Sequence, residues 1–422
     1  MSRWSEIVGA THVATGGAGD AVDGLVPACV VRPASAAEVQ ACVRAAAAEG
    51  LALVASGLGA HLDVGAPPSR RFVLLGLDRL ARVVDHQAGD MTVTAEAGCP
   101  LGLLSDVLAA AGQWLPIDPP RPRSTTVGGL IAANLSGPLR ASQGRVRDLL
   151  LGIRTVGADG AVVSSGGRVV KNVAGYDLPK LHVGALGTVG VILEATFKVR
   201  PRPAREEAVV IACRSVEAAG ETALAVAAGQ LVPLWLEVAG PGGLPEGPRD
   251  GAAVVVGLGG IAEEVEEARA RTMDLARARG SGAVAVADGA GLRTRLADFA
   301  ALPAAAVLRA GVLPAEVAAL IRDVTARASA SGVPLRCLAH AASGVVRVAV
   351  PQAEAVAPLV AALRPGLEAR GGSLIVERAA PAVKTGVDVW GDVGPAMGLM
   401  RGVKAAFDPA GLFAPGRFVG GL

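Results

Sequence analysis

Aromatic residues and clustered positive charge are both scarce in this sequence. Only 3% of the 422 residues are Phe, Trp or Tyr, and Tyr176 is the sole tyrosine. The formal net charge is +2, and the lysines and arginines form no block. Proteins that bind nucleic acids need clustered cations against phosphates and often stack aromatic side chains on bases. We therefore expect no nucleic-acid partner.

Cysteine pairs and long hydrophobic runs are missing as well. The five cysteines lie far apart, without a Cys-x-x-Cys pair and without histidines at metal-ligand spacing. No stretch reaches the roughly 18 uninterrupted apolar residues of a membrane helix, and the first residues contain no apolar signal-peptide core. We expect reduced thiols, no metal site, no iron–sulfur cluster on this chain, no transmembrane segment and a cytoplasmic location.

Glycine, by contrast, is abundant. Many of the 56 glycines fall in a short loop at 56–62 and in a long stretch at 118–200. Without a Cβ, glycine adopts positive φ and leaves amide N–H groups accessible, which suits the binding of a diphosphate or a flat ring by main chain. Turns in an ordinary α/β domain would give the same composition. The order of the motifs must decide between these interpretations.

The expected elements divide the chain into two domains. A strand, a capped helix and a second strand within 28–55 lead into the loop at 56–62. Arg200-Pro201-Arg202-Pro203 then removes two backbone donors, which is typical of a domain boundary. Because single cores stop growing near roughly 250 to 300 residues, we expect domains at 1–203 and 204–422.

The second half repeats one order of elements. Strand, helix, strand, strand and helix are expected within 208–279, and the same order with a final strand within 305–377. This is the ferredoxin-like βαββαβ pattern, so an α+β fold with two such units is expected. A G-x-G-x-x-A pattern at 257–262 would instead fit a second dinucleotide site. We prefer the ferredoxin-like interpretation because it already accounts for this strand and helix.

Three glycine motifs follow in the order of a known family. The loop at 57–65 resembles G-x-G-T-x-L-x-x-G, 125–137 resembles T-x-G-G-x-x-x-x-N-x-x-G, and 187–192 resembles G-x-x-G-V-I. The first half thus resembles the PCMH-type FAD-binding domain of the vanillyl-alcohol oxidase family. The resemblance implies a two-subdomain FAD-binding domain followed by a ferredoxin-like α+β cap.

The resemblance also implies bound FAD. It places the diphosphate on the first loop, the ring and ribityl chain near the second motif, and the adenine and ribose beside the third. Relatives that attach flavin covalently carry a histidine where Gly59 stands here, so non-covalent FAD is expected. The implied cofactor-binding residues are Ser56, Gly57, Leu58, Gly59, Ala60, His61, Leu62, Pro119, Thr125, Thr126, Gly128, Gly129, Asn134, Gly187, Gly190, Val191 and Ile192.

Two further stretches narrow the resemblance. Residues 167–178 and 407–417 resemble the FAD-binding subunits of glycolate oxidases. This implies a homologous FAD-containing catalytic subunit and an iron–sulfur subunit as partners. It also implies glycolate or another small 2-hydroxy acid, such as D-lactate, as the substrate of the complex. Partner subunits would hold such a chain at the inner face of the membrane.

The second half contains two candidate catalytic residues, His340 and Arg347. Related 2-hydroxy acid dehydrogenases carry H-A-G-D-G-N-x-H, whose histidines hold a metal or the substrate carboxylate; the matching stretch here keeps His340 but has Ser343 and Arg347. Arginine keeps its proton, so it serves neither as a base nor as a metal ligand. The metal-assisted site is therefore expected to be lost. Arg347 could clamp a carboxylate, although a solvated strand arginine is the commoner role.

Tyr176 is a third catalytic candidate, with Lys171, Asn172 and Asp177 around it. Tyrosine and lysine can act as acid or base, but a role in anchoring a loop or a partner surface is favoured. Three functions stay open: an accessory flavin subunit, a self-sufficient FAD-dependent dehydrogenase or oxidase, and a non-catalytic structural subunit.

Overall fold

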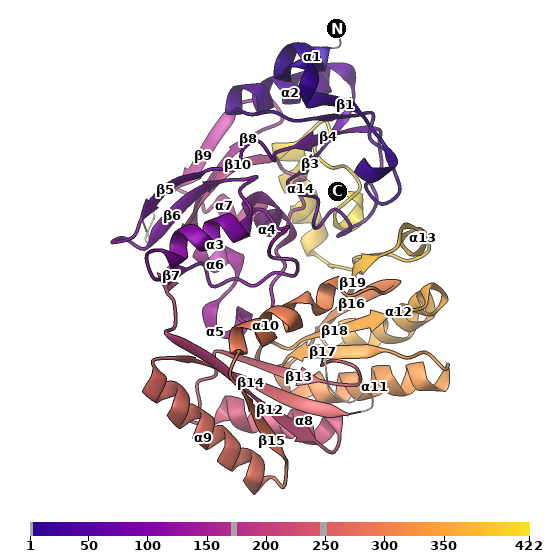
Figure 1. The fold of residues 1–422 in the computed structure, drawn as a ribbon. Coiled ribbons are helices and arrows are strands. Elements are labelled where there is room, and N and C mark those ends of the chain that lie inside the picture. The colour runs from indigo at the N-terminus through magenta and orange to yellow at the C-terminus, as the bar shows by residue number, and fades with distance from the viewer. Residues whose placement is uncertain (1–2, 170–174, 245–250) are drawn as a thin grey trace.

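The computed structural model describes residues 3–169, 175–244 and 251–422, which form two bodies in contact (Figure 1). The first half of the chain builds the upper body in this view, and most of the chain after residue 204 builds the lower one. Among the described residues, no helix is long and apolar enough to cross a membrane.

A four-stranded sheet in the upper body delivers the first glycine loop. Its strands lie in the order β1 (Val13–Thr15), β2 (Cys29–Val31), β4 (Phe72–Gly76) and β3 (Ala52–Ser56), with β2 and β3 parallel to β4. Helix α2 (Ala36–Glu49) connects β2 to β3. The Ser35 side chain caps it by accepting from Glu38 N, and Gly50 ends it in the left-handed region. Because β3 is largely buried, the loop at 57–62 starts from a fixed edge.

The second sheet of this body is antiparallel. Its order is β5 (Val83–Gln87), β6 (Thr92–Glu96), β10 (Val191–Lys198), β8 (Leu150–Val156) and β9 (Val162–Gly166). The connecting elements are α1 (Arg3–Val8), α3 (Leu101–Ala109), β7 (Gln113–Trp114), α4 (Val127–Ala133), α5 (Arg140–Gln143), α6 (Val146–Leu149), α7 (Pro179–His182) and β11 (Arg200–Pro201). Both sheets share one hydrophobic core with α2 and α4.

The lower body is built on an eight-stranded sheet. Its order, β15-β12-β14-β13-β17-β18-β16-β19, joins two βαββαβ units through the pairing of β13 with β17. The first unit is β12 (Arg205–Cys213), α8 (Val216–Ala228), β13 (Trp235–Ala239), β14 (Ala252–Gly260), α9 (Ala262–Ala278) and β15 (Ala283–Val286). The second is β16 (Ala306–Gly311), α11 (Val317–Ala330), β17 (Arg336–His340), β18 (Val345–Val350), α12 (Ala353–Glu368) and β19 (Ser373–Ala379). The α+β fold and its ferredoxin-like cap are confirmed.

The two faces of this sheet differ. Helices α8, α9, α11 and α12 pack on one face with a large aliphatic core. The other face carries Trp235, meets α10 (Gly289–Ala297), and packs against Leu139 of the upper body. Gly257, the first glycine of the possible dinucleotide motif, lies against Trp235, whose ring would be 2.0 Å from a Cβ there. This motif therefore serves the packing of the sheet.

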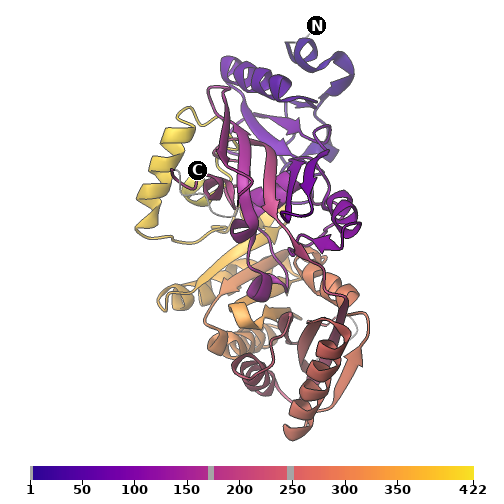
Figure 2. The ribbon, with the colours of Figure 1, turned by 90° about the vertical axis from the view of Figure 1, so that its left-hand side faces the viewer.

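The last part of the chain returns to the upper body. After α13 (Pro381–Lys384) and α14 (Ala396–Phe407), residues 408–417 run beside β3. Figure 2 shows the end of the chain, in yellow, against the upper body. Leu53 N donates to Leu412 O, and Ala414 N donates to Leu53 O, both at 2.8 Å. Phe413 is 1% exposed within the core of the upper body. The expected second domain, 204–422, thus includes a stretch that packs with the first, and the boundary at 203 stays a prediction.

Phe413 tests how strongly this return stabilises the fold. We expect Phe413→Ala to lower the free energy of unfolding by about 3–5 kcal/mol, because it leaves a cavity in a closed core. Leu399→Ala on α14 is the matched control, since Leu399 is 74% exposed and its loss should change stability by less than about 0.5 kcal/mol. Urea unfolding followed by circular dichroism measures both. Equal effects would contradict the packing role of the segment.

Candidate functional site

The loop after β3 presents a row of amide donors beside a groove. The amides of residues 57–61 donate no hydrogen bond to any other described residue. The groove is lined by residues 56–62, by α4, and by Leu186 and Arg417. Main-chain N–H groups without internal acceptors must bond to water or to a ligand. The loop therefore fits an anionic group such as a diphosphate.

Two glycines give this loop its path. A Cβ on Gly57 would lie 2.2 Å from Thr126 Oγ1, so only glycine allows the loop to approach α4 this closely. Gly59 has a φ of +76°, a backbone conformation that residues with a Cβ rarely adopt. Leu58 lies between them with 49% of its surface exposed, so its bulk does not crowd the core.

The two threonines of the second motif have different roles. Thr126 caps α4, because its Oγ1 accepts from Gly129 N at 3.3 Å. Thr125 is fully buried, and its hydroxyl lies 2.9 Å from the carbonyl of Arg121, to which it donates. Thr125 therefore supports the loop from within. The groove itself is lined by Thr126, Gly128 and Gly129.

His61 joins the first loop to the second motif. Its Nε2 lies 2.8 Å from Thr125 Oγ1. Because the Thr125 hydroxyl donates to a carbonyl, its oxygen accepts from His61, which assigns the proton to Nε2. Burial lowers the pKa of His61 to about 4. The ring is therefore neutral at physiological pH.

Part of the third motif, Gly187, Gly190 and Ile192, lines a hollow that adjoins the groove and shares Gly57, Thr126 and Leu186 with it. Val191 is 1% exposed and belongs to the core around β10. Asn134 ends α4 in the left-handed region, with φ +50, and Pro119 is buried. Neither Asn134 nor Pro119 lines the groove. Three of the predicted cofactor residues, together with Thr125, thus do not line the groove.

Arg417, which the sequence analysis did not single out, holds the loop from the C-terminal segment. Its Nη2 donates to the carbonyls of Leu62 at 2.8 Å and Val64 at 2.6 Å. Its Nη1 has no hydrogen-bond partner among the described residues and lies 3.7 Å from Asp23 Oδ2. The resemblance at 407–417 was a signal that this stretch mattered. It did not reveal that the stretch returns to the glycine loop.

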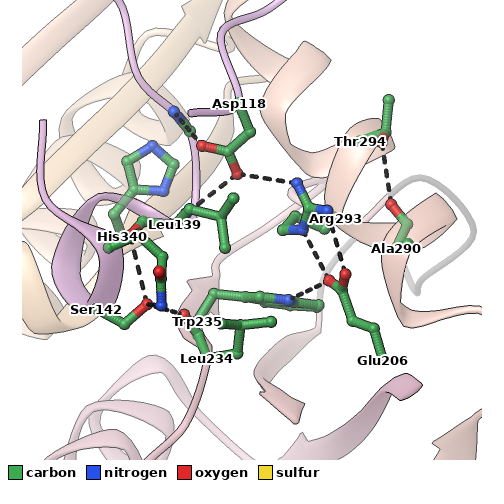
Figure 3. A network of polar contacts seen from close by, with 12 residues as sticks. Asp118, Leu139, Ser142, Glu206, Leu234, Trp235, Ala290, Arg293, Thr294 and His340 are labelled. Atoms are coloured by element: carbon green, nitrogen blue, oxygen red, sulfur yellow. Dashed lines mark hydrogen bonds and ion pairs between the residues drawn. The ribbon is translucent and has the colours of Figure 1, made fainter. Parts of the chain in front are cut away.

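A second polar region lies where the two bodies meet (Figure 3). Asp118 accepts from Gly137 N and Leu139 N, both at 3.1 Å. Arg293 on α10 lies 3.5 Å from Asp118 and donates through Nε to Glu206 at 2.7 Å. The chain of contacts fixes a loop of the upper body to the sheet of the lower one. Burial raises the pKa of Asp118 to about 6.

Four buried ionisable side chains lie next to this network, on strands of the lower body. Arg347 donates to Glu377 through Nε at 2.7 Å and Nη2 at 3.2 Å, and Nη2 also donates to the carbonyl of Ser136 at 3.1 Å. Arg347 Nη1 contacts His340 Nε2. His340 Nδ1 lies 2.8 Å from Glu237. All four side chains are at most 4% exposed.

Burial and pairing set the charges of this cluster. Burial raises the pKa of Glu237 well above the usual range of a glutamate. Burial also lowers the pKa of His340 well below the usual range of a histidine. Burial alone would also raise the pKa of Glu377, but Arg347 and Arg309 outweigh it and lower that pKa. His340 is therefore a neutral ring, and Arg347 with Glu377 forms a buried ion pair.

These contacts correct the expectation for Arg347. The expected solvated strand arginine is wrong, because the side chain is 4% exposed and lies between the two bodies. A clamp on a substrate carboxylate is also unavailable, because Glu377 already occupies the guanidinium fork.

The cluster does not fit a divalent cation. The guanidinium of Arg347 lies against His340 Nε2 and against the Glu377 carboxylate, the two groups that would otherwise serve as ligands. A group that keeps its positive charge repels a metal ion. Across residues 3–169, 175–244 and 251–422, no three His, Cys, Asp or Glu side chains are grouped as ligands.

The remaining catalytic candidate, Tyr176, lies on the surface with 91% of its area exposed. Its neighbour Asp177 lies 3.8 Å from Lys180 Nζ. Lys171 and Asn172 lie outside the described residues. The anchoring or interface role of this stretch stays a prediction.

The pKa of His61 predicts an acid-sensitive loop. The group is neutral in the folded chain down to about pH 4, whereas in the unfolded chain it binds a proton below about pH 6.5. Stability present above pH 6.5 is therefore lost as the pH falls toward 4, by up to about 1.4 kcal/mol per pH unit. His61→Gln should lack this loss.

Urea unfolding of both proteins at pH 7.5, 5.5 and 4.5 measures the difference. His182, whose pKa burial also lowers to about 4, is present in both proteins and cancels. Parallel stability curves would show that His61 is protonated in the folded chain.

Curated relatives match parts of this chain. Glycolate oxidase subunit GlcE of Escherichia coli K12 is 43% identical over 122 residues, 29% of this chain and 35% of that protein. D-2-hydroxyglutarate dehydrogenase of Xanthomonas citri pv. viticola is 33% identical over 45% of this chain and 40% of its own length. Glycolate oxidase subunit GlcD of Bacillus subtilis is 27% identical over 50% of this chain and 45% of its own length. The chain thus spans less than half the length of these relatives.

Solved structures share the fold over most of the chain. An alkyldihydroxyacetonephosphate synthase superposes with a TM-score of 0.73 at 19% identity, covering 92% of this chain and 76% of that one. The 4-ethylphenol oxidase of Gulosibacter chungangensis superposes with a TM-score of 0.73 at 17% identity, covering 99% of this chain and 95% of that one. At these identities the likeness concerns the fold alone.

Two family descriptions cover the two halves. "FAD binding domain" matches residues 27–166, which include the first two glycine motifs, and "FAD linked oxidases, C-terminal domain" matches residues 202–418. The second match alone spans just over half of the chain. Together with the free amides of the glycine loop, these matches show that the chain belongs to the FAD-linked oxidases with a PCMH-type FAD-binding domain, and that FAD is its cofactor.

Proposed function

We propose that this chain is the FAD-binding subunit of a complex that oxidises a small 2-hydroxy acid. The substrate would be glycolate, giving glyoxylate, with D-lactate as a second candidate. The partners would be a homologous FAD-containing catalytic subunit and an iron–sulfur subunit. The names of the E. coli and B. subtilis relatives, both glycolate oxidase subunits, support this. The chain would lie in the cytoplasm, held at the inner membrane face only through its partners.

One observation supports the subunit role. The side chains of the buried cluster near the joint of the two bodies already bond to one another. FAD, when bound, accepts the hydrogen and electrons that leave C2 of a hydroxy acid, and a base must take the hydroxyl proton. His340 Nε2 accepts from Arg347, and Nδ1 donates to Glu237. Glu377 is held by Arg347. The cluster offers no free base, so the base would come from the homologous partner.

The cofactor contacts belong to the same proposal. The amides of residues 57–61 would bind the diphosphate of non-covalent FAD, because they lack other acceptors within the described chain and open onto the groove. Gly187 and Gly190 would border the adenine and ribose. Thr125 and Arg417 would hold the loop in shape without needing to touch the cofactor.

Gly57 tests these contacts. We expect Gly57→Ala to weaken FAD binding at least about tenfold, or about 1.4 kcal/mol, because a Cβ 2.2 Å from Thr126 Oγ1 must displace the loop. Gly102→Ala is the control, since a Cβ at Gly102 on α3 meets nothing within 4 Å. Fluorescence titration of the deflavinated chain with FAD measures both. Unchanged affinity in Gly57→Ala would place the diphosphate elsewhere.

A self-sufficient FAD-dependent 2-hydroxy acid or alcohol dehydrogenase is the alternative function. The observation that favours it is Asp118, beside the cluster: burial raises the pKa of its carboxyl group to about 6, within the range of a general base. A non-catalytic structural subunit is the third possibility.

The visible spectrum of the purified chain separates these functions. Glycolate and D-lactate are added without oxygen, first to the chain alone and then after addition of the partner subunits. We expect bound flavin that stays oxidised until the partners are present.

Flavin that bleaches in the isolated chain would contradict the subunit role. Loss of that bleaching in Asp118→Asn would then assign the base. A colourless chain that takes up no FAD would leave the structural role.

A further inference from the structure

Arg347 occupies the centre of a set of groups that point toward one cation. The Glu377 carboxylate binds its Nε and Nη2, and His340 Nε2 faces Nη1. The carbonyl of Ser136 accepts a further hydrogen bond at 3.1 Å. A carboxylate, an imidazole nitrogen and a carbonyl are thus arranged around the guanidinium.

The proton arrangement of His340 completes this pattern. Because a guanidinium nitrogen only donates, His340 Nε2 must accept, and the ring proton must lie on Nδ1 and point to Glu237. A histidine that ligates a metal has the same arrangement, with one nitrogen toward the cation and the other N–H on a carboxylate. Glu237, at 0% exposure, accepts from His340 Nδ1, so its carboxyl group has the place of that support.

We propose that the guanidinium of Arg347 is a built-in cation that takes the place of a divalent metal ion at the joint of the two bodies. Its single charge is permanent and its planar fork matches the Glu377 carboxylate. The guanidinium therefore fills the cation position without a metal ion, and an imidazole in its place would add a ligand to His340 and Glu377. The inference is independent of the proposed function, since it concerns metal content and stability and requires no turnover.

Arg309 shows that position matters as well as charge. It stands directly opposite Arg347 in the pairing of β16 with β18, and it also contacts Glu377, at 3.3 Å. Its side chain is 32% exposed, however, and no contact joins it to His340 among the described residues. Removing Arg309 would leave Arg347 in place, so it provides a matched control.

The decisive variant is Arg347→His in the full chain with FAD. It removes the guanidinium and supplies an imidazole as the third ligand beside His340 and Glu377. After dialysis against Zn²⁺ or Mn²⁺, we expect about one metal ion per chain by mass spectrometry of the elements. We also expect a rise in Tm of about 3 °C or more that EDTA reverses. The wild-type chain and Arg309→His should bind less than about a tenth of an equivalent.

Two outcomes overturn the proposal. One is a folded Arg347→His chain that binds no metal. The other is a wild-type chain that binds one equivalent of metal ion while the Glu377→Gln variant binds none. The metal ion would then bind beside Glu377, and the guanidinium of Arg347 would not occupy that position. If Arg347→His fails to fold, the Tm values of Arg347→Lys and Arg347→Met test the cation role instead. The lysine retains a cation against Glu377, so its Tm should lie closer to wild type than that of the methionine. Equal losses of Tm would also count against a cation role.

Discussion

The arrangement of the two bodies depends on the cost of burying charge. The face of the eight-stranded sheet that meets the upper body carries Glu237, Arg347 and Glu377, each almost without solvent exposure. A buried charge without a partner is strongly destabilising, and a buried polar group needs a hydrogen bond, so Arg347 and Glu377 must pair and Glu237 must bond to His340. Arg347 pairs within the sheet and also reaches the carbonyl of Ser136 across the joint. The docking of the bodies and the pairing of these charges are therefore one requirement.

Local features were predictable from the sequence. The capped helix from Ala36 and the glycine loop after β3 follow from short patterns whose physics acts over a few residues. The repeated βαββαβ order was predictable because each unit must cover one sheet face with two helices. The family assignment is consistent with the order of the glycine motifs.

Features that arise from distant parts of the chain were not predictable. The sequence predicts that Arg347 lies on a strand. It does not show the contact with Ser136, which lies 211 positions earlier, so the burial of Arg347 could not be inferred. Arg417 gave no sign that it would bond to Leu62, 355 residues away. Thr125 matched a cofactor motif, yet its hydroxyl is used inside the protein. A motif specifies residue types, whereas the use of each side chain depends on its neighbours in space.

The return of residues 408–417 to β3 has a consequence for the order of folding. Leu53 exchanges two main-chain hydrogen bonds with Leu412 and Ala414, and Phe413 fills the core between them. During synthesis, residues 1–400 are made before this strand-like segment. The lower body can therefore assemble as a unit while the upper one still exposes apolar surface. Contacts at this sequence separation form slowly, so chaperones have their longest opportunity to bind at the cofactor-binding body.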